Sequence, residues 1–119
     1  MKITNAKPFF PNKDIDSILN DIKDSLRTGV LTLGPNVEKL EREFADYVGV
    51  KHAIAVNSGT SALEIALRYF ELNGGEVIVP TNSFVASANA VIFAGGKPVL
   101  VDIKKETLCI DPNEIRKKI

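Results

Sequence analysis

The sequence predicts an α/β fold: an N-terminal helical arm followed by alternating strands and helices of a mainly parallel sheet. Two observations support this prediction. Apolar residues recur at helical spacing over residues 15–48, whereas from residue 53 short apolar runs alternate with helical patterns. The short runs are apolar throughout, which is typical of strands buried on both faces of a parallel sheet. We therefore expect an arm and two helices in residues 1–52, and the first part of a larger domain in residues 53–119.

In residues 1–52 the two helices are marked by apolar positions three or four residues apart and by terminal glycines. The arm includes Pro8–Pro11, the first helix ends at Gly29 and the second at Gly49. Between the helices, Gly34-Pro35 indicates a turn. The apolar positions are Ile15, Ile18, Leu19, Ile22 and Leu26 in the first helix, and Val37, Leu40, Phe44, Tyr47 and Val48 in the second.

From residue 53 onward the sequence predicts a strand–helix alternation. The expected strands are residues 53–56, 76–80 and 98–101. The expected helices run from residue 60 or 61 to 73, and from about 84 to 94. A last helix opens at Asp111, because Asp-Pro-Asn-Glu supplies an N-cap, a proline at the first helical position and an acidic residue soon after.

Composition and charge exclude several classes of function. The 15 basic and 15 acidic residues of the 119-residue chain balance, so no global field favours nucleic acid or an anionic membrane. No apolar run is long enough to span a membrane, and no signal-type apolar core follows residues 1–5, so we expect a cytoplasmic protein. Cys109 and His52 are the single cysteine and histidine, which leaves no internal disulfide and no multi-histidine metal site.

The predicted sheet directs attention to the turns that follow its strands. Ligands of open α/β sheets bind beyond the carboxyl ends of the strands. Right-handed crossovers bring the turns 57–61, 81–84 and 102–105 to that edge. The first turn opens a helix, whose N-terminus attracts anions such as phosphate. The second supplies hydroxyl groups and the Phe84 ring, and the third supplies the Asp102 carboxylate.

Each of these residues also has a purely structural interpretation. Ser61–Glu64 has the pattern of a capping box, so the small polar residues there could serve only to start a helix. Phe84 could be a core aromatic residue, and Asp102 could cap a turn. His52 is expected to be structural or exposed. Cys109, between two apolar residues, is expected to be a small buried side chain.

Five motifs in order resemble the DegT/DnrJ/StrS-type nucleotide-sugar aminotransferases, which use pyridoxal phosphate (PLP) and have the aspartate-aminotransferase fold. The resemblance covers nearly the whole chain and implies a three-layer large domain, of which this chain holds an incomplete part. The motifs are Gly34-Pro35-x-Val37-x-x-Leu40-Glu41 with Tyr47–Ala53, then Val56–Leu63, Glu76–Pro80, Phe84–Ala90 and Gly95–Asp102.

Carried over to this chain, the resemblance implies a set of cofactor contacts. Thr60 and Ser61 would give backbone N–H groups and hydroxyls to the PLP phosphate. Ser58 and Gly59 would shape the turn, and Phe84 would stack on the pyridine ring.

The resemblance also implies a location for two segments of the N-terminal part. The arm and the 31–34 loop would lie near the sugar-nucleotide pocket or a partner subunit.

Two positions depart from the pattern of the family. Ser87 stands where the family commonly has threonine, which keeps the hydroxyl, and Gly75 stands where it has aspartate.

The resemblance leaves the chain catalytically incomplete. The family's Schiff-base lysine and the aspartate that pairs with the pyridinium nitrogen lie in a later region, and no lysine here is a suitable substitute. We expect the N-terminal part of an aminotransferase that moves an amino group, from glutamate, to a keto-sugar nucleotide for polysaccharide or glycan biosynthesis. The complete enzyme would be a homodimer, or the chain would associate with a downstream half.

Three alternatives remain open from the sequence. The chain could be a non-catalytic or regulatory remnant, or part of a sugar dehydratase of the same family. A generic Rossmann-like nucleotide binder is disfavoured because no Gly-x-Gly-x-x-Gly follows a strand.

Overall fold

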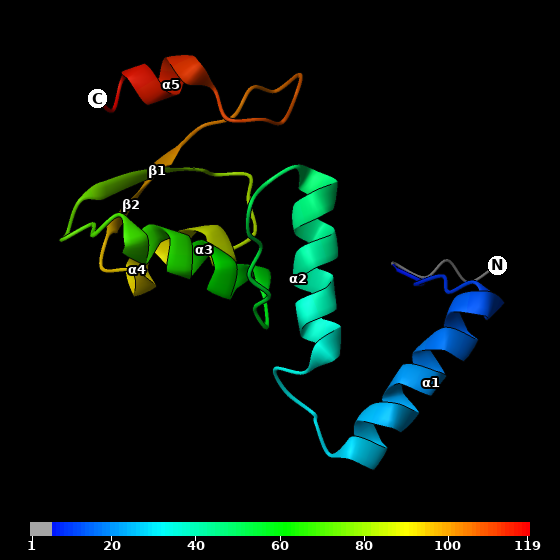
Figure 1. Cartoon of the computed structure of the whole chain (residues 1–119). Coiled ribbons are helices and arrows are strands. Elements are labelled where there is room, and N and C mark those ends of the chain that lie inside the picture. The colour runs from blue at the N-terminus through cyan, green and yellow to red at the C-terminus, as the bar shows by residue number, and fades with distance from the viewer. Residues whose placement is uncertain (1–5) are drawn as a thin grey trace. The chain divides into compact units, whose positions relative to one another are not determined.

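A computed structural model describes residues 6–119, and the first five residues of the expected arm lie outside them. The chain divides into two compact units, one up to Ala55 and one from Val56 to Ile119 (Figure 1). We call them unit 1 and unit 2. Within the described residues, no helix is both long and apolar enough to cross a membrane.

Unit 1 contains the two expected helices, α1 (Asn12–Thr28) and α2 (Pro35–Val48). Each ends at a glycine in the left-handed region, with φ of 73° at Gly29 and 77° at Gly49. A side chain is strained there and glycine is not, so both glycines stop their helices as the sequence predicts.

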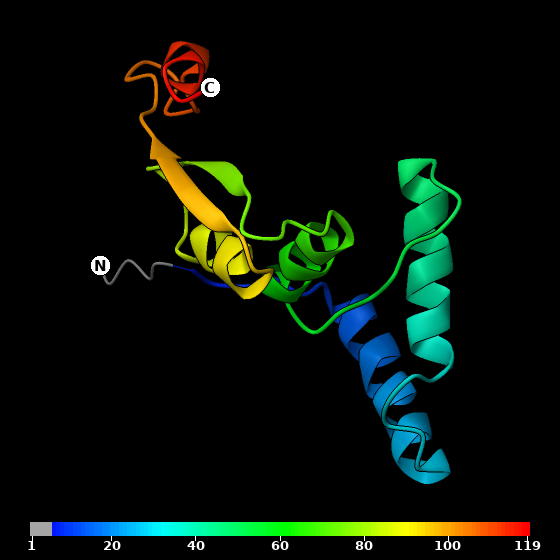
Figure 2. The same cartoon turned by 90° about the vertical axis from the view of Figure 1, so that its left-hand side faces the viewer.

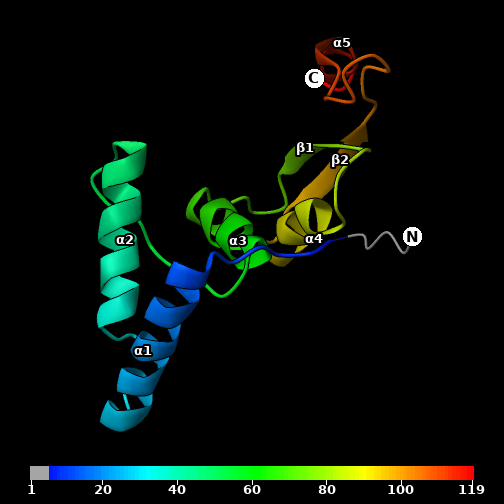
Figure 3. The same ribbon diagram turned by 90° about the vertical axis from the view of Figure 1, so that its right-hand side faces the viewer.

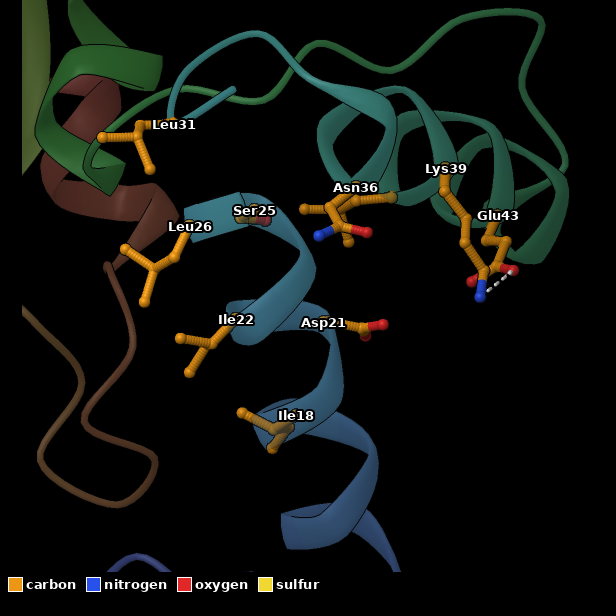
Figure 4. Close-up of a pocket in the computed structure, with 10 residues that line it drawn as sticks. Ile18, Asp21, Ile22, Ser25, Leu26, Leu31, Asn36, Lys39 and Glu43 are labelled. Atoms are coloured by element: carbon orange, nitrogen blue, oxygen red, sulfur yellow. Dashed lines mark ion pairs between the residues drawn. The ribbon is translucent and has the colours of Figure 1, made fainter. Parts of the chain in front are cut away.

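Side chains of α1 and α2 line an open cavity of about 520 Å³ (Figure 4). Ile18, Ile22 and Leu26 of α1 contribute to its wall, and an ion pair between Lys39 and Glu43 of α2, 3.8 Å long, lies on its rim. Ile22 remains 50% exposed and Leu26 68% exposed. These apolar side chains therefore lie on an uncovered face.

The strand expected at residues 53–56 is not formed. Residues 53–55 make no ladder with another strand in the described chain, and the N–H of Ala55 instead donates to the Glu41 carboxylate at 2.8 Å. A β-strand needs a neighbour to satisfy its backbone groups. The apolar pattern predicts an extended segment, but it does not show whether a neighbouring strand is present to pair with it.

Unit 2 is built on a parallel pair of strands, β1 (Glu76–Pro80) and β2 (Lys97–Val101), with Glu76 opposite Lys97 and Pro80 opposite Val101. Two helices, α3 (Gly59–Tyr69) and α4 (Ala86–Phe93), pack against each other on the same side of the strands (Figures 1 and 2). The buried residues of this unit are Val79, Ala90, Val91 and Val101. The predicted parallel α/β arrangement is confirmed.

Helix boundaries differ from the expected ones where the backbone turns. α3 ends at Tyr69 instead of Asn73, because Glu71 and Asn73 adopt φ of 48° and 49°, which no right-handed helix contains. α4 begins at Ala86, two residues later than expected. α5 (Pro112–Arg116) has the predicted cap, with the Asp111 carboxylate accepting from the Asn113 N–H at 2.8 Å.

An ion pair closes α5 at its C-terminal end. The Lys117 ammonium lies 2.6 Å from the Glu114 carboxylate. The pKa of Lys117 is raised, chiefly by this hydrogen bond and then by the charge of Glu114.

The chain exposes more surface than a compact protein of its size. Its accessible area is 10126 Å². A globular protein of this length has about 6,300 Å², and two separate globules of half the mass about 7,600 Å² together. Large apolar side chains contribute to the excess, such as Leu19 at 58% and Phe44 at 56% exposure.

We expect the isolated chain to self-associate because of this exposed apolar surface. Sedimentation velocity over a wide range of concentrations should show species larger than a monomer, and the thermal transition should move with concentration. A monomer with one sharp, concentration-independent transition would contradict this expectation.

Candidate functional site

The turns after β1 and β2 lie at the carboxyl edge of the sheet. The two strands are parallel and in register to their last residues, and the Thr81 N–H donates to the Val101 carbonyl at 2.9 Å. The turns 81–84 and 102–105 therefore start side by side, as the sequence predicts.

The N-terminus of α3 faces the same edge. At the opposite edge, the loops that follow α3 and α4 are joined by the bonds Gly74 N–H to Gly95 O and Lys97 N–H to Gly75 O, both 2.9 Å. Because α3 and α4 pack side by side (Figure 3) and both end there, both begin toward the carboxyl edge. Within residues 6–119, no hydrogen bond joins turn 57–61 to either of the other turns.

Ser58 caps α3. It has extended backbone angles, with φ of −160° and ψ of 157°, and its Oγ accepts from the Ser61 N–H at 3.1 Å. The alternative of a capping box at Ser61–Glu64 is not formed: the cap is Ser58, three residues earlier, and the Glu64 carboxylate pairs with Arg68 at 2.8 Å. An N-cap side chain can bond only the second or third N–H that follows it, which fixes Ser58 in this role.

Two N–H groups at this terminus have no partner in the described part of the chain, those of Gly59 and Thr60. The Ser61 N–H, by contrast, is bonded by Ser58. A Cβ added to Gly59 would meet nothing within 4 Å, so open space lies in front of the pair. Unpaired donors at a helix N-terminus, with room before them, suit a phosphate oxygen. The sequence interpretation gave Gly59 only a shaping role; its position directly after the cap was the signal for a donor.

The hydroxyl of Ser61 is held beside this pair. Its Oγ donates to the Asn57 side-chain carbonyl at 2.8 Å and lies 3.0 Å from the Ser58 Oγ. The three side chains form one polar cluster at the start of α3, and Asn57 enters it without having been singled out from the sequence.

Phe84 is not a core residue, because its side chain is 78% exposed. Its carbonyl accepts from the Ser87 N–H at 3.0 Å, and the hydroxyls of Ser83 and Ser87 lie 2.6 Å apart. The ring is therefore free to contact a ligand, and its backbone is held by the turn that leads into α4.

The remaining candidates have structural surroundings. The Asp102 carboxylate accepts from the N–H of Ile103 at 2.8 Å and so caps its own turn. His52 is exposed, as expected. Cys109 is also exposed, and the expectation of burial is wrong because no other part of the described chain covers its side chain in the 103–110 loop. In the part of the chain that the structure describes, no three metal-ligating side chains gather.

The pattern of a known family covers residues 12–119, that of the DegT/DnrJ/EryC1/StrS aminotransferase family. The chain belongs to this family. It is 43% identical to the 3-oxo-glucose-6-phosphate:glutamate aminotransferase of Bacillus subtilis (strain 168), over 94% of the chain and 27% of that protein. It is 41% identical to the GDP-perosamine synthase of Caulobacter vibrioides, over 92% of the chain and 29% of that protein.

Solved structures of sugar-aminotransferase relatives have the same fold over this segment. Spr1654 from Streptococcus pneumoniae, in its PMP-form, superposes with a TM-score of 0.89 at 32% identity, over 100% of the chain and 29% of Spr1654. The same protein is known in a PLP-form. The chain thus spans less than a third of the length of these family members, and its small parallel sheet is an incomplete aminotransferase domain.

Proposed function

We propose that the chain is the N-terminal part of a PLP-dependent sugar aminotransferase and that it holds the cofactor's phosphate and ring. The observation that carries the proposal is the open N–H pair of Gly59 and Thr60 at the start of α3, in a family with a relative known in a PLP-form. When bound, PLP supplies the electron sink that amino-group transfer requires.

The described residues fit the cofactor's phosphate in number and kind of donor. The N–H groups of Gly59 and Thr60 would bind phosphate oxygens, and the Thr60 hydroxyl would add a further donor. The Ser61 hydroxyl, which donates to Asn57 at 2.8 Å, would bind the phosphate only by leaving that partner. Ser58 keeps the helix terminus in place by bonding the Ser61 N–H.

Phe84 would orient the cofactor ring. Its exposed side chain follows β1 at the carboxyl edge toward which α3 begins. An aromatic face against the pyridine ring limits its rotation and shields one side from water.

The lysine that binds the cofactor covalently would come from outside this chain. Lys97 begins β2 at the opposite edge of the sheet, and Lys104 lies in the 103–110 loop, with its N–H bonded to the Cys109 carbonyl at 2.8 Å. By itself the chain would bind the cofactor without performing the reaction.

The substrate we propose is a keto-sugar nucleotide, with glutamate as the amino donor, in a cytoplasmic homodimer that serves polysaccharide or glycan biosynthesis. The name of the Caulobacter vibrioides relative includes a GDP-linked sugar, which supports a nucleotide-linked sugar as the substrate. The name of the Bacillus subtilis relative favours a second candidate, a keto-sugar 6-phosphate, and glutamate as donor.

The decisive experiment uses a chimera in which this chain replaces the segment that it matches in the Bacillus subtilis relative. After incubation with PLP and borohydride reduction, the chimera should carry one covalent PLP group, and the isolated chain none. The chimera should also form 2-oxoglutarate from glutamate when a keto-sugar is supplied. A nucleotide-linked and a 6-phosphate keto-sugar, offered in competition, distinguish the two substrates. A folded chimera that binds no PLP would overturn the proposal and favour a non-catalytic remnant.

A further inference from the structure

The turn between β1 and α4 contains a hydroxyl pair on either side of Phe84. Ser83 precedes the aromatic residue and Ser87 lies one helical turn later, and their Oγ atoms are 2.6 Å apart. This is at the short end of O–H···O distances, which indicates a well-formed hydrogen bond. Together with the bond from the Ser87 N–H to the Phe84 carbonyl, it closes the turn around the backbone of Phe84.

The surroundings of Ser87 are apolar, so its hydroxyl depends on this bond for a hydrogen-bond partner. Ser87 is half-buried and lines an apolar cavity of about 270 Å³ between α3, β1 and α4. The other side chains of the cavity wall are Leu63, Ala66, Leu67, Val77, Ile78, Val79, Pro80 and Val91. A hydroxyl at such a wall loses solvation, and the side-chain partner it has is Ser83.

Among residues 6–119, the only other side-chain hydrogen bond in this turn is a long one, from the Asn82 amide to the Leu108 carbonyl at 3.4 Å. The N-cap position of α4 is Val85, which makes no capping hydrogen bond. The 78% exposed ring of Phe84 is not held by packing either. The hydrogen bond between the Ser83 and Ser87 hydroxyls is therefore the side-chain contact that fixes the orientation of Phe84 in this turn.

We infer that Ser83 and Ser87 are positioning residues that fix Phe84 at the angle needed to stack on the cofactor ring. This inference rests on the proposed function, because the ring that Phe84 contacts is that of PLP. Ser87 touches neither cofactor nor substrate and acts through Phe84. Threonine at position 87 would keep the hydroxyl and so the bond to Ser83.

The test measures PLP affinity of the chimera by fluorescence titration, together with hydrogen exchange of the Ser87 N–H without cofactor. Ser83→Ala and Ser87→Ala should each weaken PLP binding about 3- to 10-fold, the range that one hydrogen bond supplies, and the double variant should be no weaker. Both should speed exchange of the Ser87 N–H. Ser87→Thr should restore the wild-type affinity. Thr107→Ala, which removes a hydroxyl bonded to the Cys109 N–H in the 103–110 loop, is the matched control and should bind PLP as wild type does.

A background lacking the aromatic ring separates positioning from general stability. In Phe84→Ala, adding Ser87→Ala should leave PLP affinity unchanged. The same loss in both backgrounds would show that the pair only stabilises the turn, and normal PLP affinity of the serine variants would equally overturn the inference. Failure of the unsubstituted chimera to bind PLP overturns the proposed function, and the inference with it; PLP binding that ignores the serines overturns the inference alone.

Discussion

Replacing Gly59 by aspartate should abolish measurable PLP binding by the chimera while leaving its fold intact. The carboxylate would occupy the open space before the Gly59 and Thr60 N–H groups, where it satisfies the helix terminus and repels the phosphate. A unit charge about 5 Å from a phosphate, at an effective dielectric of about 20, contributes several kcal/mol, so we expect at least about a 100-fold loss of affinity. An acidic residue in the first turn of a helix stabilises it by about 0.3–1 kcal/mol.

Gly59→Asn is the matched control, because it has the size of aspartate without the charge. It should weaken PLP binding by about 10-fold, through obstruction alone, and added salt should not change that ratio. The aspartate variant should recover part of its affinity in high salt. Thermal melting checks that both variants fold. Wild-type PLP affinity in Gly59→Asp would show that the phosphate lies elsewhere.

Replacing Val91 by aspartate should prevent unit 2 from folding. Val91 is 1% exposed, and its Cγ1 lies 3.1 Å from the position of a Cβ on Gly96, so the site has no room for water to follow a carboxylate. An unpaired buried charge costs about 4 kcal/mol or more, a large part of the stability of a whole domain. The expected result is loss of soluble chimera, or loss of its cooperative melting transition.

The neighbouring residue provides the control for this substitution. Ile92 is 54% exposed, and Ile92→Asp should shift the free energy of unfolding by less than about 1 kcal/mol. Equal stability of the two aspartate variants would mean that α4 does not pack on the sheet as described. The two positions are adjacent in the same helix, so helix propensity cancels in the comparison.

Local signals predicted most of the secondary structure. Gly29 and Gly49 end their helices, and Asp111 caps the last one, because each acts through its own backbone conformation or a bond to a near neighbour in sequence. Strands depend on partners elsewhere in the chain. For β1 and β2 the partner is present, and the predicted strand 76–80 is found with the bounds expected. For residues 53–56 it is absent from the described residues.

The candidate site was predictable in place but not in detail. Parallel strands bring their following turns to one edge, and that rule located the turns with Ser58–Ser61 and Phe84. Which serine caps α3 depends on which of them has extended backbone angles, and the pattern of small polar residues, which suggested a cap at Ser61, does not show that Ser58 has them. The roles assigned to Thr60, Ser61 and Phe84 in cofactor binding stay predictions. Cys109 is exposed because no other segment of the described chain covers its loop, and the residues next to it in sequence do not indicate whether a distant segment will do so.

The bond between the Glu41 carboxylate and the Ala55 N–H bears on how this chain meets its neighbours. A free strand edge recruits any extended segment, including those of other molecules. With its donor bound by a carboxylate, Ala55 can pair with a strand only after Glu41 is displaced, so the pairing is an exchange of hydrogen bonds instead of a simple addition. Any strand that pairs at residue 55 therefore carries the added cost of breaking the hydrogen bond between Glu41 and Ala55.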